Sequence, residues 1–103
     1  MYKFCFYVPV EYAEQVKRAV FKTGAGKLGE YAECCWQSAG TGQFRPLAAS
    51  QPFLGQTGKL EQVEELKVEL LCAPEYIQQA VAALKQAHPY EEPAYEIIKL
   101  ETI

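Results

Sequence analysis

The stretch EYAEQVKRAV, residues 11–20, decides the fold because a related stretch, EYIQQAVAAL, follows 64 positions later at residues 75–84. Both begin with the polar pair Glu-Tyr, and both carry apolar residues at the spacing of an amphipathic helix. In addition, Tyr31 after the first helix corresponds to Tyr95 after the second. Apolar helix positions often match by chance, but the repeated polar pair favours an internal duplication over coincidence.

Alternating apolar residues mark strands on either side of the two helices. The alternation has the two-residue period of a strand, and it ends at Pro9 in the first half and before Pro74 in the second. A proline also ends the second helix, at Pro89. The expected elements are strands over residues 2–8, 65–72 and 94–101 and helices over residues 11–23 and 77–87.

A glycine-containing zone separates the two halves, since all seven glycines lie between Gly24 and Gly58. Within it, residues 31–38 alternate like a strand, and Ala39-Gly40-Thr41-Gly42 predicts a turn. A short second strand over residues 43–45 would complete a hairpin. Residues 46–59 contain two prolines and two glycines and predict an ordered loop.

The order strand, helix, hairpin, strand, helix, strand, built from two related halves, is typical of the split β-α-β arrangement of ferredoxin-like folds. We therefore expect one α+β domain over residues 1–103, with an antiparallel sheet and two helices on one face. The strand at residues 43–45 is expected as an extra hairpin strand. A chain of 103 residues is long enough to bury one hydrophobic core.

The composition excludes several kinds of chemistry. All 13 acidic residues are Glu, Asp and Asn are absent, and the only histidine is His88. Ser-His-Asp triads, EF-hand loops, HExxH zinc helices and phosphorylated Asp sites each need residues that this chain lacks. The formal net charge of −3 argues against nucleic-acid binding, which needs a surplus of Lys and Arg. The residues contain no catalytic constellation, so we do not expect an enzyme.

The lack of a predicted membrane span or signal peptide, together with the cysteine pattern, favours a cytoplasmic protein. No apolar run approaches the roughly 20 residues of a membrane span, and residues 1–10 are not typical of a signal peptide. We therefore expect no membrane contact. The cysteines lack CxxC spacing and predict reduced, mostly buried side chains rather than metal ligands; they are Cys5, Cys34, Cys35 and Cys72.

Two further features are expected to be structural. Trp36 shares a strand face with Cys34, so we expect it to pack in the core. Glu64 and Glu65 are adjacent on a strand and point to opposite faces, which makes them poor acid–base partners. These two carboxylates are expected to face solvent or an interface.

Gly24, Gly26 and Gly29 match the G-x-G-x-x-G pattern of dinucleotide-binding loops. However, that pattern needs a strand before it and a helix after it, whereas here a helix precedes and a strand follows. The glycines are therefore expected to end the helix in a left-handed conformation and to allow a close backbone approach. The alternative is a ligand-binding loop in which backbone N–H groups and Lys27 hold an anion or a nucleotide phosphate.

The loop His88-Pro89-Tyr90-Glu91-Glu92-Pro93 follows the second helix. Histidine is the side chain whose ordinary pKa lies near neutrality, and the two prolines stiffen the loop around it. His88, Glu91 and Glu92 are therefore candidate ligands of a divalent metal ion, and His88 alone is a candidate acid or base. The structural alternative is that His88 favours the C-terminus of the helix and that the glutamates are solvated.

The duplication makes the loops at residues 24–29 and 88–93 equivalent, because each joins a helix to the next strand. The pseudo-twofold axis of a ferredoxin-like sheet places such loops at opposite ends of one subunit. They can therefore share a site only across a subunit interface.

Several ordered motifs resemble the YqfO family over nearly the whole chain. They are Gly24-Ala25-Gly26-Lys27-Leu28-Gly29-Glu30-Tyr31 with Cys34 and Trp36, Gly42-Gln43-Phe44-Arg45-Pro46, Pro52-Phe53-Leu54-Gly55, residues 61–65, and His88-Pro89-Tyr90-Glu91-Glu92-Pro93-Ala94-Tyr95. In that family the stretch occurs alone or as an insertion in larger proteins of the NIF-three type, also called GTP cyclohydrolase I type 2 homologues. The inserted domain resembles CutA and PII proteins, which are ferredoxin-like trimers. The resemblance therefore implies a homo-oligomer, with a trimer favoured and with loops that meet at subunit boundaries.

The larger relatives carry a two-metal site built from His, Asp and Glu in host domains, and this chain contains none of that host sequence. The resemblance implies a regulatory or binding role instead of a hydrolase activity. Two hypotheses remain open. The first is a homo-oligomeric module that binds a small ligand or a divalent metal ion, and the second is a structural or protein-interaction domain.

Overall fold

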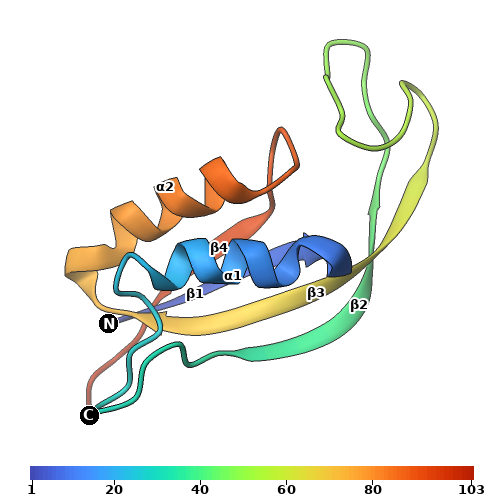
Figure 1. Cartoon of the computed structure of the whole chain (residues 1–103). Helices are drawn as coiled ribbons and strands as arrows, with labels where there is room; N and C mark the ends of the chain where they lie inside the picture. Colours follow the sequence, from blue (N-terminus) through green and yellow to red (C-terminus); the bar gives the residue numbers. More distant parts are fainter.

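Four strands form one antiparallel sheet in the computed structural model, which describes residues 1–103. The strand order is β2-β3-β1-β4, so the first strand lies between two strands that follow much later in the chain (Figure 1). The elements in chain order are β1 (Tyr2–Pro9), the 3₁₀ turn η1 (Val10–Tyr12), α1 (Ala13–Phe21), β2 (Trp36–Phe44), β3 (Glu61–Cys72), the 3₁₀ turn η2 (Pro74–Tyr76), α2 (Ile77–Ala87) and β4 (Tyr95–Lys99). This is the ferredoxin-like α+β fold that the sequence predicts.

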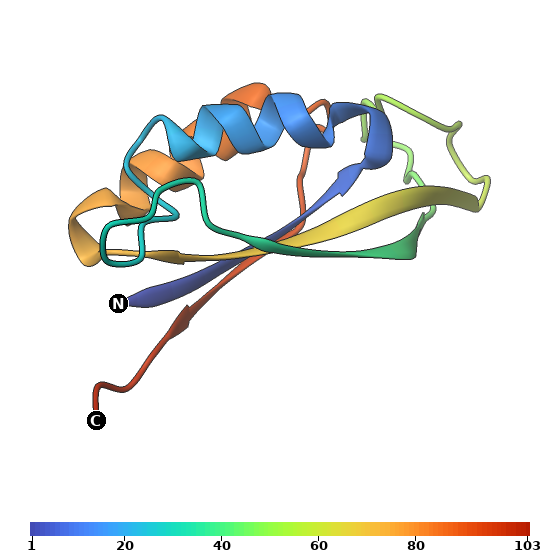
Figure 2. The ribbon, with the colours of Figure 1, turned by 60° about the horizontal axis from the view of Figure 1, so that its bottom comes forward.

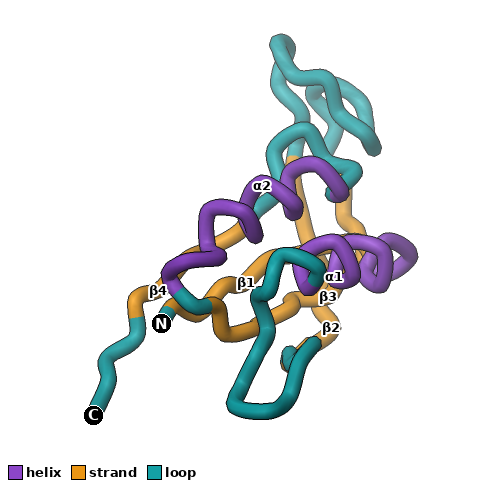
Figure 3. Tube along the Cα trace, turned by 60° about the vertical axis from the view of Figure 1, so that its left-hand side comes forward, coloured by secondary structure: helices purple, strands orange, loops and turns teal.

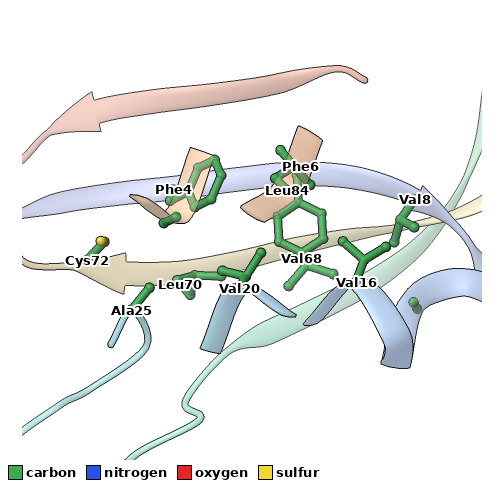
Figure 4. Close-up of a cluster of buried hydrophobic side chains, with 12 residues drawn as sticks. Phe4, Phe6, Val8, Val16, Val20, Ala25, Val68, Leu70, Cys72 and Leu84 are labelled. Atoms are coloured by element: carbon green, nitrogen blue, oxygen red, sulfur yellow. The ribbon is translucent and has the colours of Figure 1, made fainter. Parts of the chain in front are cut away.

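The two helices cover one face of the sheet (Figure 2), and the hydrophobic core lies between the helices and this face. Each large apolar side chain that leaves water on folding contributes about 1.5–3 kcal/mol, so this layer is the main source of stability. Neither helix is long and apolar enough to cross a membrane. The larger buried side chains of the core, drawn in Figure 4, are Phe4, Phe6, Val8, Val16, Val20, Val68, Leu70 and Leu84.

Both halves of the chain begin their helices at equivalent positions, which supports the internal duplication. η1 and α1 begin at Val10 and Ala13, and η2 and α2 begin at Pro74 and Ile77, which is the 64-residue offset seen in the sequence. The equivalence ends after the helices, because β2 has nine residues and β4 has five.

β2 and β3 continue beyond the rest of the sheet as a two-stranded arm. β3 pairs with β1 only from Glu65 onward, so residues 61–64 pair with β2 alone. Residues 45–60 connect the two strands and form the tip of the arm, which bends toward the side that carries the helices (Figures 1 and 2). The tube view shows this tip beyond the end of α2 (Figure 3).

The predicted turn at residues 39–42 and the predicted extra strand at residues 43–45 are wrong. Both segments belong to the continuous strand β2, in which Gly40 pairs with Glu65. The turn prediction fails because Gly42 lies inside a strand, where it packs close to the side chain of Glu65. A Cβ atom at Gly42 would overlap the carboxylate of Glu65 in its present position, so glycine lets this carboxylate lie close to β2. The sheet therefore has four strands.

The segment before β2 also differs from the prediction. The strand begins at Trp36, whose side chain is 71% exposed and does not pack in the core. β2 is an edge strand, so an apolar alternation there does not mark a buried face. All four cysteines are free, but only Cys5 and Cys72 are buried, whereas Cys34 and Cys35 are half-buried.

Candidate functional site

The two equivalent loops lie toward opposite ends of β1, as the duplication predicts. In the first loop, Gly26 lines a hollow together with Lys3, near the start of β1. In the second loop, His88 contacts the backbone carbonyl of Tyr7, near the end of β1. The two loops therefore do not form a common site within one chain.

The glycines of the first loop have a structural role. Gly24, Gly26 and Gly29 have φ values of +103°, +84° and +57°, all in the left-handed region that favours glycine. The backbone N–H of Gly24 donates to the carbonyl of Phe21 at 3.1 Å, and that of Gly26 donates to the carbonyl of Leu71 at 2.8 Å. These bonds end α1 and tie the loop to β3, so two of the donors that a bound anion would need are already engaged.

A hollow of about 360 Å³ lies beside this first loop. Lys27 lines it, together with Trp36 and with the ion pair between Lys3 and Glu69, whose charged atoms are 2.8 Å apart. This environment holds both signs of charge, because Glu69 balances one of the two lysines. Anion binding by the first loop stays a prediction that depends on Lys27.

His88 is only 6% exposed and connects a helix, a strand and a loop. Its Nε2 lies 2.7 Å from the carbonyl oxygen of Tyr7, and its Nδ1 accepts the backbone N–H of Tyr90 at 3.1 Å. These partners define a neutral ring with the proton on Nε2. Burial lowers the pKa of His88, against the opposing effects of the Tyr7 carbonyl and Glu65. Both ring nitrogens are therefore used inside the fold.

Tyr90 lies at the centre of the contacts of the second loop. Its hydroxyl donates to Oε2 of Glu65 at 2.9 Å, and its ring centre lies 5.9 Å from that of Phe44 and 6.5 Å from that of Phe53. Burial and the hydrogen bond to Glu65 raise the pKa of Tyr90 well above its ordinary value. The hydroxyl is therefore a protonated donor throughout the neutral pH range.

A cleft of about 470 Å³ lies between the arm and the second loop, and we call it the arm cleft. Glu91 closes one side, because its Oε1 accepts the backbone N–H of Gln51 at 2.9 Å and so ties the tip of the arm to the loop. Concave sites with apolar walls and a few placed polar groups are typical of small-molecule binding. The lining side chains that define the arm cleft are Phe44, Phe53, Glu65, Tyr90, Glu91 and Glu92.

The structure does not bring His88, Glu91 and Glu92 together as metal ligands. His88 points inward to Tyr7, whereas the two glutamates line the arm cleft. No group of three or more His, Cys or Glu side chains in the structure is arranged to hold a metal ion. The contacts of His88 thus support a structural role for this side chain. Its partners are the carbonyl of Tyr7 and the N–H of Tyr90 rather than the helix dipole that the sequence suggested.

Four of the side chains that define the arm cleft were not among the candidates from the sequence: Phe44, Phe53, Glu65 and Tyr90. Glu65 is half-buried and held by Tyr90, in contrast to the solvent or interface position that we expected. No local pattern signals this contact, because it depends on how the tip of the arm folds back toward the second loop. The one available signal is Gly42, since a glycine inside a strand often marks a close approach of another group.

The chain is similar in sequence to bacterial proteins that carry the name GTP cyclohydrolase 1 type 2 homolog. It is 45% identical over 100 residues to the protein of Bacillus subtilis and 44% identical over 98 residues to that of Mycobacterium tuberculosis. These matches cover 96% and 95% of this chain but 26% of each relative, so the chain spans about a quarter of the length of the curated relatives it matches. No protein-family profile matches the chain. The resemblance to the YqfO family is confirmed.

Solved structures show the same fold. The crystal structure of a Bacillus cereus protein related to NIF3 superposes with a TM-score of 0.83 at 37% identity, over 98% of this chain and 26% of that one. CutA1 from Pyrococcus horikoshii superposes with a TM-score of 0.71 at 19% identity, over 100% of this chain and 86% of that one. The PII-like protein CutA from Nostoc sp. PCC 7120 has a TM-score of 0.69 at 16% identity, over 98% of this chain and 82% of that one. The two CutA similarities, at these identities, show the CutA/PII-like fold alone.

Proposed function

We propose, from its relationship to a quarter-length segment of the GTP cyclohydrolase 1 type 2 homologues, that this chain is a homo-oligomeric module that binds a small ligand. The arm cleft is the observation that carries the proposal. It has a volume of about 470 Å³, aromatic walls and a few carboxylates, and it lies where two segments distant in sequence meet.

Binding is favoured over catalysis because the chemistry at the cleft is limited. The only histidine is buried, and both of its ring nitrogens have partners inside the fold. Tyr90 has a raised pKa and a fixed partner in Glu65, which suits a hydrogen-bond donor better than a base. The cyclohydrolase name belongs to relatives of which this chain spans about a quarter, and it is not transferred.

Homo-oligomer formation is supported by the first-loop end of the molecule. Leu28, Tyr31 and Trp36 are 57%, 75% and 71% exposed there, and β2 is an edge strand. Large exposed apolar side chains beside an open strand edge are typical of an interaction surface. The resemblance to CutA and PII proteins favours a trimer. Light scattering should give a mass above the 11.6 kDa of one chain, and Trp36→Ser should lower it.

Ligand binding is tested by nuclear magnetic resonance on the ¹⁵N-labelled chain of 103 residues. The probes are phenethylamine, 2-phenylethanol, phenylacetate, ATP and magnesium chloride, which cover cations, neutral molecules, anions and a metal ion. At least one probe should shift the amide signals of Phe44, Phe53 and Tyr90 in a saturable way. Phe53→Ala should weaken that response, whereas Leu47→Ala, on the same tip but 65% exposed and outside the cleft lining, should not.

The second candidate function is a structural or protein-interaction domain, and the same exposed side chains near the first loop favour it. Under this alternative, Trp36→Ser changes the oligomer mass while none of the five probes shifts the signals of the arm cleft. That pair of results would reject the ligand-binding module.

A further inference from the structure

We propose that the arm cleft takes a small organic cation, such as a primary ammonium or guanidinium compound. The inference rests on the proposed function, because it names the chemical class of ligand for the same site. Three features carry it: the charge of the lining, the position of Glu65, and the aromatic walls.

The charged side chains that line the arm cleft all have the same sign. Glu65, Glu91 and Glu92 contribute to the lining, and no Lys, Arg or His does. The basic residue nearest in sequence, Arg45, is exposed and outside the lining. None of the three glutamates takes part in a salt bridge. An anionic ligand would meet unbalanced carboxylates at short range, whereas a cation would neutralise them.

Glu65 is the carboxylate that the fold places most firmly. Tyr90 donates to its Oε2 at 2.9 Å, and a Cβ atom at position 42 would overlap the carboxylate where it now lies, so Gly42 leaves space for it. Glu65 is half-buried, and its Oε1 has no hydrogen-bond donor within the chain. No fully buried side-chain oxygen in the chain lacks a partner, so this oxygen reaches the surface and can accept a hydrogen bond from a ligand N–H group. Such charge-assisted bonds are about twice as strong as neutral ones.

Aromatic rings form the walls beside this carboxylate. The centre of the Tyr90 ring lies 5.9 Å from that of Phe44 and 6.5 Å from that of Phe53. The faces of aromatic rings attract cations, and this attraction is strongest for organic cations that have lost part of their water. A site with carboxylates and aromatic rings together thus favours an ammonium or guanidinium group attached to an apolar body.

The size of the arm cleft separates an organic cation from a bare metal ion. Its volume of about 470 Å³ falls in the usual range for small-molecule sites. A metal ion would also need several ligands close together, and the structure contains no such group. The geometry therefore favours an organic cation.

The test uses three aromatic probes of similar size and different charge: phenethylamine (+1), 2-phenylethanol (neutral) and phenylacetate (−1). Each is titrated into the 103-residue chain and followed by the amide signals of Phe44, Phe53 and Tyr90. We expect phenethylamine to bind at least ~10-fold more tightly than 2-phenylethanol, and phenylacetate to bind weakest.

Matched variants assign the effect to the cleft. Glu65→Gln should weaken phenethylamine at least ~10-fold while leaving 2-phenylethanol unchanged. The fold should survive, since a glutamine side-chain oxygen can still accept from Tyr90. Glu92→Gln, at an exposed position, provides a second variant with no buried partner to lose. Glu75→Gln removes the same charge from η2, outside the cleft, and should leave phenethylamine binding unaltered.

The outcomes separate the two proposals. Equal binding of the amine and the alcohol, or tighter binding of phenylacetate, would overturn the cation proposal and leave a ligand-binding module standing. An equal loss in Glu65→Gln and Glu75→Gln would also overturn it, because the effect would then reflect net charge alone. If none of the probes, ATP and magnesium chloride included, shifts the cleft signals, both proposals fail.

Discussion

The loops that follow α1 and α2 are equivalent by duplication, but the fold holds them in different ways. The first loop, residues 24–29, depends on its backbone: three glycines in the left-handed region and hydrogen bonds between main-chain groups. The second loop, residues 88–93, depends on side chains, since the ring of His88 and the hydroxyl of Tyr90 reach to β1 and β3. Two equivalent positions of the fold are thus held by different kinds of contact.

The arm cleft lies at the end where β2 and β3 extend beyond β1, and there the second loop contacts the arm. The first loop is held by main-chain hydrogen bonds, one of them to Leu71 of β3, and makes no contact with the arm cleft. A loop fixed by long side chains brings carboxylates and rings into contact with the arm, as Tyr90 does with Glu65 and Phe53. Different substitutions should therefore destabilise the two loops. Replacing a glycine by alanine should destabilise the first loop, and removing a side-chain hydrogen bond should destabilise the second.

The largest effect is expected for Gly26→Ala. Gly26 has a φ of +84°, and a Cβ atom there would lie 2.7 Å from the ring of Phe21. Backbone strain and overpacking together should lower the free energy of unfolding by about 3 kcal/mol. Gly29→Ala is the matched control, because Gly29 has a φ of +57° and nothing within 4 Å of its Cβ position. It should cost only about 1 kcal/mol.

Urea unfolding at one fixed protein concentration measures both variants, since oligomer formation would otherwise change the apparent stability. Equal destabilisation of the two variants would show that conformational strain alone limits the first loop. The close packing against Phe21 would then have no energetic role.

The next effect is expected in the second loop, for His88→Ala. The substitution leaves the carbonyl of Tyr7 and the N–H of Tyr90 without their partners in a region that is mostly shielded from water. Buried groups left unpaired in this way should lower the free energy of unfolding by about 2 kcal/mol. Gln86→Ala, at an exposed position near the end of α2, should change the free energy of unfolding by less than about 0.5 kcal/mol. A loss below 1 kcal/mol for His88→Ala would mean that water replaces the imidazole.

The sequence could predict the parts of this comparison that depend on local pattern. The repeated Glu-Tyr pairs place both helices, and the glycines at residues 24, 26 and 29 indicate the left-handed loop that the structure contains. The ferredoxin-like order of elements follows from the same repeat. These features are predictable because helix ends and positive-φ turns depend on residues close in sequence.

The arm and its cleft could not be predicted, because they depend on contacts distant in sequence. Gly40 and Gly42 have the composition of a turn, but pairing with β3 and the side chain of Glu65 decide their conformation. His88 is similar: its chemistry made it a candidate metal ligand beside a structural alternative, and only the fold shows that the carbonyl of Tyr7, 81 positions away, contacts one ring nitrogen. Tertiary contacts override local preference at these residues.

A smaller effect is expected for Tyr90→Phe, which keeps the aromatic ring and removes one hydrogen bond. The hydroxyl donates to Glu65 at 2.9 Å, and both residues are half-buried. Its loss should lower the free energy of unfolding by about 1 kcal/mol, measured by urea unfolding. Tyr31→Phe is the control from the first-loop end, because Tyr31 is 75% exposed and its hydroxyl makes no hydrogen bond. A similar loss in both variants would remove the distinction between the two ends.

The smallest expected effect is the pH dependence of stability that comes from the lowered pKa of His88. Burial lowers the pKa of His88 in the folded chain, whereas in the unfolded chain it should be close to the ordinary value of about 6.5. As the pH falls below that value, the unfolded chain binds a proton that the folded chain still refuses, so stability decreases. The stability from the neutral ring is fully present above pH 6.5 and is lost progressively until the pH passes the lower folded pKa.

His88→Gln should remove this part of the pH dependence of stability. Because the chain has one histidine, the difference between the stability curves of the two proteins isolates the proton of His88. Proton resonances of the imidazole report the folded pKa directly, and a value at or above 6.5 would contradict a second loop held by a buried neutral histidine.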